Sequence, residues 1–242
     1  MKKIITLTFI LCIASMSYAQ WGKKIKGNGK VVTIERATGD YESIAVSGWF
    51  DVELIEGAEG AIIMKGEENL LEYIITEVKD GKLVVKPEKG VNLQPSSWKS
   101  GTISVTIPVE EINAVSMSGS GDLVGKTVLK ASDFKTSMSG SGDLSLDLEV
   151  QDLEVKVSGS GDMDLKGSTN NLEVQISGSG DVNAYGLSAN NVSAIVSGSA
   201  NIEVTANTSL KARVSGSGDI SYRGNPAKID SKTSGSGDIS KG

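Results

Sequence analysis

VSGSGD, residues 157–162, recurs with small changes through the second half of the chain. The copies open at Ser118, Ser139, Ser158, Ser177, Ser215 and Ser234, with a diverged copy, SGSAN, at Ser197. Successive copies lie 21, 19, 19, 20, 18 and 19 residues apart. A period this regular is typical of repeat architectures, in which one supersecondary unit is used many times. The glycine-rich string is therefore part of a fold and not a linker.

The residues around each copy alternate in polarity. In residues 153–167 (LEVKVSGSGDMDLKG), apolar residues or glycines occupy every second position and polar residues occupy the others. The same alternation recurs in residues 172–184 and 210–220. A period of two indicates β-strands with one buried face, and a helical spacing is absent.

A strand–bend–strand unit of about 19 residues cannot bury its inner face alone, so it must stack on its neighbours. We therefore predict an all-β fold, a right-handed parallel β-helix (β-solenoid) with coils of ~19 residues, because parallel crossovers are strongly right-handed. On this strand model Ser158, Ser160 and Asp162 point outward and stack on their counterparts. Gly159 and Gly161 point inward, where they let the wall bend or approach the opposite wall.

The first half of the mature chain is related but different. Residues 44–52 (IAVSGWFDV) fit the repeat frame, with Trp49 and Phe50 in place of the second serine and the second glycine. We interpret them as part of an earlier, wider coil. Residues 68–78 fit a short helix or a strand, and Asp80-Gly81 indicates a turn between two strands. The predicted division is a signal peptide at 1–19, an N-terminal β region at 20–111, and regular repeats at 112–242.

The N-terminus, MKKIITLTFILCIASMSYAQ, reads as a secretory signal cleaved between Ala19 and Gln20. Its apolar run is too short to span a bilayer, and no later segment is apolar enough, so we expect no membrane-spanning segment. Cleavage removes two of 24 basic residues and the single cysteine, leaving 22 basic against 30 acidic residues, a balance of −8. We expect an exported protein, in the periplasm, at the cell surface or outside the cell, that folds without a disulfide. An acidic chain with three arginines is a poor binder of nucleic acid.

The repeats predict a column of carboxylates along the coils. Its members are Asp122, Asp143, Asp162, Asp181, Asp219 and Asp238. Stacked like charges are unfavourable unless each accepts hydrogen bonds or shares a cation. In one reading backbone N–H groups of the bend satisfy them; in the other, calcium or another hard cation bridges them. Asn201, a neutral near-isostere in the same column, favours the structural reading, and we expect no cofactor.

The sequence argues against an enzyme. There is no histidine for general-base work, and the mature chain has no cysteine nucleophile. Asp162 with Asp164, or Asp143 with Asp147, fits a carboxylate pair of a glycosidase, yet alternate outward acids are ordinary on a solvated strand face. Three aromatic residues, Trp49, Tyr185 and Tyr222, are candidates for stacking on a sugar or a partner. Alternatively, residues 85–101 fold over Trp49.

Several motifs together resemble a bacterial family described as putative auto-transporter adhesin, head GIN domain. They are the signal, residues 48–52 (GWFDV), residues 69–71 (NLL) followed by 76–83 (TEVKDGKL), and the SGSGD coils. The resemblance covers nearly the whole mature chain. It implies a β-helical fold, an extracytoplasmic location in Bacteroidetes-like bacteria and an adhesin role, and it carries no catalytic motif.

We therefore expect an exported, non-enzymatic envelope or extracellular protein, an adhesin-like module that binds a surface polymer or protein. A polysaccharide-active β-helix enzyme and a purely structural envelope protein are the alternatives. The expected partner is a glycan or a protein surface, and open coil edges suit a homo-oligomer, because an unpaired strand can pair with another chain.

Overall fold

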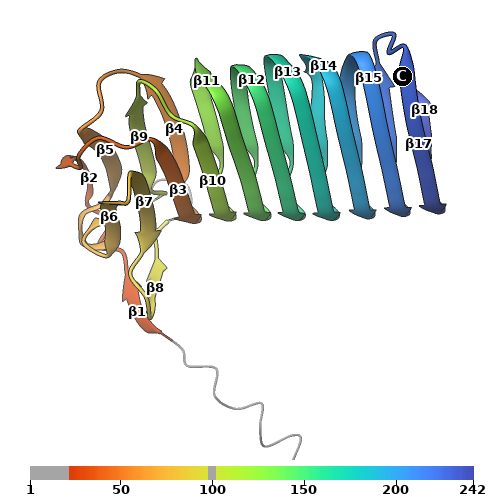
Figure 1. The fold of residues 1–242 in the computed structure, drawn as a ribbon. Helices are drawn as coiled ribbons and strands as arrows, with labels where there is room; N and C mark the ends of the chain where they lie inside the picture. The colour runs from red at the N-terminus through yellow and green to blue at the C-terminus, as the bar shows by residue number, and fades with distance from the viewer. Residues whose placement is uncertain (1–21, 98–101) are drawn as a thin grey trace, which may run out of the picture.

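The computed structural model describes residues 22–97 and 102–242, and the expected signal peptide at 1–19 lies outside them. Figure 1 shows a row of stacked coils joined to a head of shorter strands. Stacked parallel strands build the coils. They are β10 (Ala114–Gly119), β11 (Leu123–Gly140), β12 (Leu144–Gly159), β13 (Met163–Gly178), β14 (Val182–Gly198), β15 (Ile202–Gly216), β16 (Ile220–Arg223), β17 (Lys228–Gly235) and β18 (Ile239–Lys241). The predicted β-solenoid with coils of about 19 residues is confirmed.

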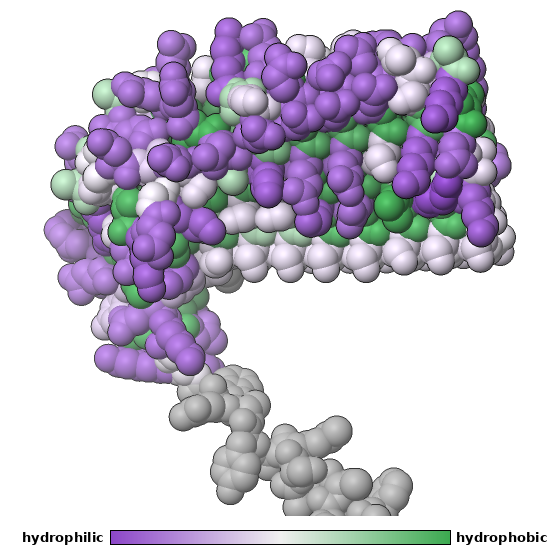
Figure 2. All heavy atoms as spheres, in the orientation of Figure 1, coloured by the Kyte–Doolittle hydropathy of each residue, from purple (hydrophilic) through white to green (hydrophobic). Residues whose placement is uncertain are grey.

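Within the repeat string, the register stacks each serine and glycine on its own kind. Ser139 pairs with Ser158, which pairs with Ser177, and the glycines that follow them pair in the same way. The alternate side chains point inward and form one continuous core, which includes Leu153, Val155 and Val157. In Figure 2 the row of bends is pale, as serine and glycine are, and apolar bands run between polar columns.

The glycines of the bend allow neighbouring coils to approach closely. A Cβ on Gly159 would lie 2.2 Å from the carbonyl oxygen of Gly140, and one on Gly161 would lie 2.0 Å from that of Gly142. Gly159 also has φ +143°, a conformation that L side chains rarely adopt. Of the two roles expected for these glycines, the positive φ of Gly159 fits a bend in the wall, and the close contact that they permit is with the preceding coil and not with the opposite wall.

The predicted relation of residues 44–52 to the repeats is also confirmed. Strand β3 (Ser43–Gly48) pairs in parallel with β10, so that Ser47 lies beside Ser118 and Gly48 beside Gly119. Strand β4 (Asp51–Glu56) continues this coil and pairs with the start of β11. The chain then leaves the solenoid and forms the head before it returns at β10.

The head is a mixed β region. Its strands are β2 (Val31–Ala37), β5 (Ala61–Glu67), β6 (Ile74–Lys79), β7 (Lys82–Pro87) and β9 (Ser104–Val109). Residues 68–78 form both elements that their sequence allows, the short helix α2 (Glu68–Leu71) and then β6. The predicted turn at Asp80-Gly81 joins β6 to β7, with φ of 52° and 72°. Because β7 pairs with β3 in parallel, the head covers the first coil of the solenoid.

A separate two-stranded ribbon projects from the head. It consists of β1 (Lys23–Lys26) and β8 (Val91–Gln94), which pair in parallel with each other. In Figure 1 the ribbon leaves the head on the side of the bends. At the other end of the molecule, β17 pairs with β15 alone among the described strands.

Candidate functional site

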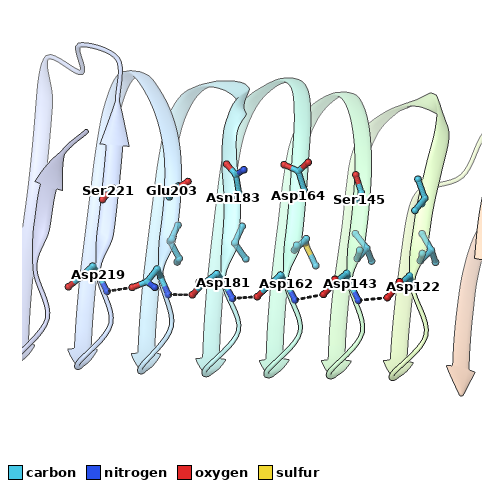
Figure 3. Close-up of a pocket in the computed structure, with 17 residues that line it drawn as sticks. Asp122, Asp143, Ser145, Asp162, Asp164, Asp181, Asn183, Glu203, Asp219 and Ser221 are labelled. Carbon is cyan, nitrogen blue, oxygen red and sulfur yellow. Dashed lines mark hydrogen bonds between the residues drawn. The ribbon is translucent and has the colours of Figure 1, made fainter. Parts of the chain in front are cut away.

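The aspartate column forms a hydrogen-bonded ladder at the mouth of a groove (Figure 3). The backbone N–H of Asp143 donates to Oδ1 of Asp122 at 3.2 Å, and that of Asp162 donates to Oδ1 of Asp143 at 3.2 Å. The ladder continues through Asp181 at 2.9 Å. It ends with the N–H of Asp238, which donates to Oδ1 of Asp219 at 2.8 Å. Each carboxylate therefore ties its own coil to the coil that follows.

Asn201 takes part in this ladder without a charge. Its N–H donates to Oδ1 of Asp181 at 2.8 Å, and its own Oδ1 accepts the N–H of Asp219 at 3.1 Å. The ladder thus requires a side-chain acceptor oxygen and not a negative charge. This geometry supports the structural reading of the column.

The alternative reading of the column is a row of metal ligands. Among residues 22–97 and 102–242, no group of three or more acidic side chains is placed to hold a metal ion. Parallel coils lie ~4.8 Å apart, and two exposed charges at that distance repel by about 1 kcal/mol in water. The donated N–H groups offset part of this repulsion.

A second outward column runs beside the aspartates and was not anticipated as part of a site. It contains Ser145, Asp164, Asn183, Glu203 and Ser221, each two residues beyond the column of aspartates and Asn201. Between the two columns lie buried side chains such as Leu144, Met163 and Val182. The two polar columns and this apolar floor form a groove of about 630 Å³ that runs from Asp122 to Ser221. The alternation of the repeat, taken over two further residues, would have revealed the second column.

The groove is electrostatically negative. Its lining includes seven acidic residues and no basic one: Asp122, Asp143, Asp162, Asp164, Asp181, Glu203 and Asp219. The ion pair nearest to it joins Asp164 to Lys166 at 2.9 Å. The carboxyl group of Asp164 raises the pKa of Lys166, mainly through the hydrogen bond between them. A negative groove attracts neutral hydroxyl donors and cationic groups and repels acidic polymers.

A second groove, of about 650 Å³, lies on the other side of the bends. Its lining includes the outward serines that begin each repeat string, from Ser47 to Ser197, among them Ser158. Lys156 and Gln175 stand beside them in the next outward column. Ser160 lies exposed on the bend between the two grooves. The side chains of the Ser158 column and of the Ser160 column therefore both point outward, as predicted.

A third polar surface of the coils is formed by amide side chains that hydrogen-bond to one another from coil to coil. Asn171 Nδ2 donates to Oδ1 of Asp152 at 2.6 Å, and Asn191 Nδ2 donates to Oδ1 of Asn171 at 3.0 Å. A parallel pair joins Asn190 to Asn170 at 3.0 Å. These side chains satisfy one another, so this surface stabilises the stack.

The three aromatic candidates do not form one site. Trp49 is half-buried against the core, with its ring centroid 5.9 Å from that of Phe50. Tyr185 and Tyr222 lie in β14 and β16, where Tyr222 is half-buried against the core and the guanidinium of Arg223 stacks 3.9 Å from the centroid of the Tyr185 ring. Part of the segment proposed to cover Trp49, residues 98–101, lies outside the described residues.

Comparison with known proteins identifies a family. A family model described as "Putative auto-transporter adhesin, head GIN domain" matches residues 40–226. No curated protein matches the chain. In the described part of the chain, no helix has the length and apolar character needed to cross a bilayer.

Solved structures share the whole architecture. A putative adhesin from Bacteroides fragilis is 25% identical, with a TM-score of 0.80 over 90% of this chain and 99% of its own. A putative lipid binding protein from Parabacteroides distasonis is 26% identical, with a TM-score of 0.70 over 91% of this chain and 100% of its own. A putative adhesin from Parabacteroides merdae is 24% identical, with a TM-score of 0.76 over 91% of this chain and 99% of its own. The likeness extends over both the head and the solenoid.

Proposed function

Since the chain belongs to the putative auto-transporter adhesin, head GIN domain family, we propose that it is an exported, non-enzymatic binding protein of the cell envelope or exterior. Its ligand is a surface polymer or protein that lies along the coils. The adhesin description of the family, and of the B. fragilis relative, supports this role and a location at or beyond the cell surface. The observation that carries the proposal is the continuous acidic groove from Asp122 to Ser221.

The groove suits an extended ligand with hydroxyl or ammonium groups. The ladder uses Oδ1 of each aspartate, and a carboxylate has a second oxygen that can accept further hydrogen bonds. Because the coils repeat every ~4.8 Å, these acceptors form an evenly spaced row. A polymer with its own regular repeat can make the same contact several times, and repeated weak contacts add up to strong binding. The negative charge favours a neutral or amino-bearing glycan, or a basic protein segment, over an acidic polysaccharide.

The absence of histidine from the chain supports a non-enzymatic role. The two carboxylates proposed as a catalytic pair already have other partners. Asp162 accepts a hydrogen bond in the ladder, and Asp164 forms an ion pair with Lys166. A glycosidase needs one carboxyl group kept protonated beside one that is ionised. A column in which every coil repeats the same carboxylate singles out no such pair.

The test is binding to a glycan array by the chain from Gln20 onward, which contains every described element. The critical variant is D143N/D162N/D181N, because Asn201 shows that asparagine maintains the ladder while the charge is lost. The matched control, D133N/D152N/E173Q, removes the same number of charges from a different surface of the coils, a hollow lined by Asp133, Asp152 and Glu173. We expect the groove variant to lose at least tenfold in affinity for its glycans and the control to keep it. Equal binding by both variants would place the ligand elsewhere, and shortening of a bound glycan would favour the enzyme.

A further inference from the structure

The ribbon formed by β1 and β8 differs in charge from the rest of the molecule. Residues 22–34 contain four lysines and no acidic residue, whereas residues 114–242 contain 15 acidic and 11 basic residues. Three of these lysines, Lys23, Lys24 and Lys26, lie on β1 itself, and a fourth lysine, Lys89, precedes β8 next to the exposed Glu88. All four are exposed. The molecule is therefore electrically asymmetric, with a positive ribbon on a negative body.

The two faces of the ribbon have different surroundings. One face carries Ile25 and Leu93, which pack against the hydrophobic core of the head. Because side chains alternate along a strand, the other face carries Lys24 and Lys26 from β1 and Asn92 and Gln94 from β8. All four of these residues are exposed and none is acidic. The outer face is thus a small basic surface without a pocket.

The ribbon is held firmly by the head. Asn69, in α2, donates from Nδ2 to the carbonyl oxygen of Lys26 at 2.8 Å and accepts the N–H of Asn28 at 3.0 Å. The buried carboxylate of Glu67 accepts the N–H groups of Gly29 and Ser96, which follow the two strands. These contacts present the lysines at a fixed place on the head.

We propose that the outer face of the β1/β8 ribbon docks on an anionic lipid surface. Lysine ammonium groups on an open face recognise a dense, laterally uniform negative charge better than a single shaped ligand, since each is a point charge without a fixed fork. Exposed lysines near a charged bilayer each contribute to binding, and the attraction falls off within a Debye length. The rest of the head (residues 35–113, with 15 acidic and 7 basic residues) and the solenoid are both acidic and are repelled from the same surface, so the ribbon sets which part of the molecule makes contact. This inference concerns the head and stands apart from the groove.

The experiment measures co-sedimentation of the chain from Gln20 onward with vesicles of phosphatidylcholine containing 0 or 30% phosphatidylglycerol, in 0.1 M salt. The ribbon variant is K24E/K26E, whose side chains face away from the core. The control, K228E/K232E, makes the same charge change on β17, at the far end of the solenoid. We expect binding only to the anionic vesicles, at least a tenfold loss in the ribbon variant, and little change in the control.

Three results would overturn the proposal: no binding of the unaltered chain, equal binding to both vesicle types, or equal losses in both variants. The last would mean that overall charge, and not the ribbon, governs attraction. Binding to a column of a soluble acidic polysaccharide but not to vesicles would assign the ribbon a different partner and also overturn it. Circular dichroism of each variant shows whether it keeps the β-sheet fold.

Discussion

At the scale of single residues, each column of the solenoid imposes one requirement on every coil. Thr136 departs from its column, because it lies inside the solenoid between Val115 and Val155. Among the buried side-chain atoms of the described residues, its hydroxyl oxygen is the one without a hydrogen-bond partner. A buried hydroxyl that makes no hydrogen bond destabilises the folded state, because it has lost its bonds to water.

We predict that Thr136→Val raises the free energy of unfolding by about 1–2 kcal/mol. The matched control is Thr169→Val, since the hydroxyl of Thr169 donates to the carbonyl oxygen of Gln151 at 3.0 Å. That substitution breaks a made hydrogen bond and should lower stability by about 1 kcal/mol. Urea unfolding of both variants measures the difference, and two changes of the same sign would contradict the account.

The first glycine of the bend is a second residue with a strict requirement. Gly159→Ala places a methyl group against the carbonyl oxygen of Gly140 and forces alanine into φ +143°. We predict a loss of more than about 2 kcal/mol. Gly60 has φ +108° with no neighbour within 4 Å of an added Cβ, so Gly60→Ala should lose only about 1 kcal/mol. Thermal melts that show equal losses would mean that coil contact is unimportant.

At the scale of elements, Glu67 couples the ribbon to the head. Burial alone would raise the pKa of Glu67, but the N–H groups of Gly29 and Ser96 hold that pKa below its usual value. A lowered pKa means that the carboxylate stabilises the fold at pH values above its ordinary pKa of 4.5. This stabilisation is lost as the pH falls through the lowered value.

We therefore predict that acid loosens the ribbon before it unfolds the solenoid. Amide-exchange protection factors of residues 23–26 should fall between pH 6 and pH 3, while those of β13 stay constant. Glu67→Gln should lower ribbon protection at pH 6 and make it less dependent on pH. Glu68→Gln, which breaks only the exposed pair with Lys30 at 2.7 Å, should change little. A ribbon in Glu67→Gln as protected as in the unaltered chain at pH 6 would argue against the coupling.

At the scale of the whole molecule, each coil contacts chiefly its neighbours, so a coil can be removed. Deletion of residues 163–181 joins Asp162 to Val182, which pairs with Met163 in the register and takes its place after Asp162. We predict that this shortened chain folds with a lower melting temperature, because stability is roughly a sum over repeats and their interfaces. Deletion of residues 163–172 removes half a coil and should prevent the later strands from pairing. Circular dichroism and thermal melts distinguish the two, and similar behaviour would contradict the repeat model.

The solenoid could be predicted from the sequence, whereas much of the head could not. The repeat places Ser158, Ser160 and Asp162 on outward columns because period and alternation are both visible in the letters. No period relates β2 to β5 or β4 to β9, because these pairs depend on long-range closure of the chain. The hydrogen bonds from Gly29 and Ser96 to Glu67 could not be predicted for the same reason, since both residues are far from Glu67 in sequence. The contact of Gly159 with Gly140 depends on the distance between coils, which sequence patterns do not reveal.

The aspartate ladder has a direction, since each Oδ1 from Asp122 to Asp219 accepts an N–H from the coil that follows it. An inserted copy of the 19-residue unit would donate its N–H to the Oδ1 of the coil before it. Its own Oδ1 would accept the N–H of the coil after it. Tandem duplication within a gene can therefore lengthen the protein without any compensating substitution. The number of coils then sets the length of the groove, while the row of acceptors along its edge keeps the same direction and spacing.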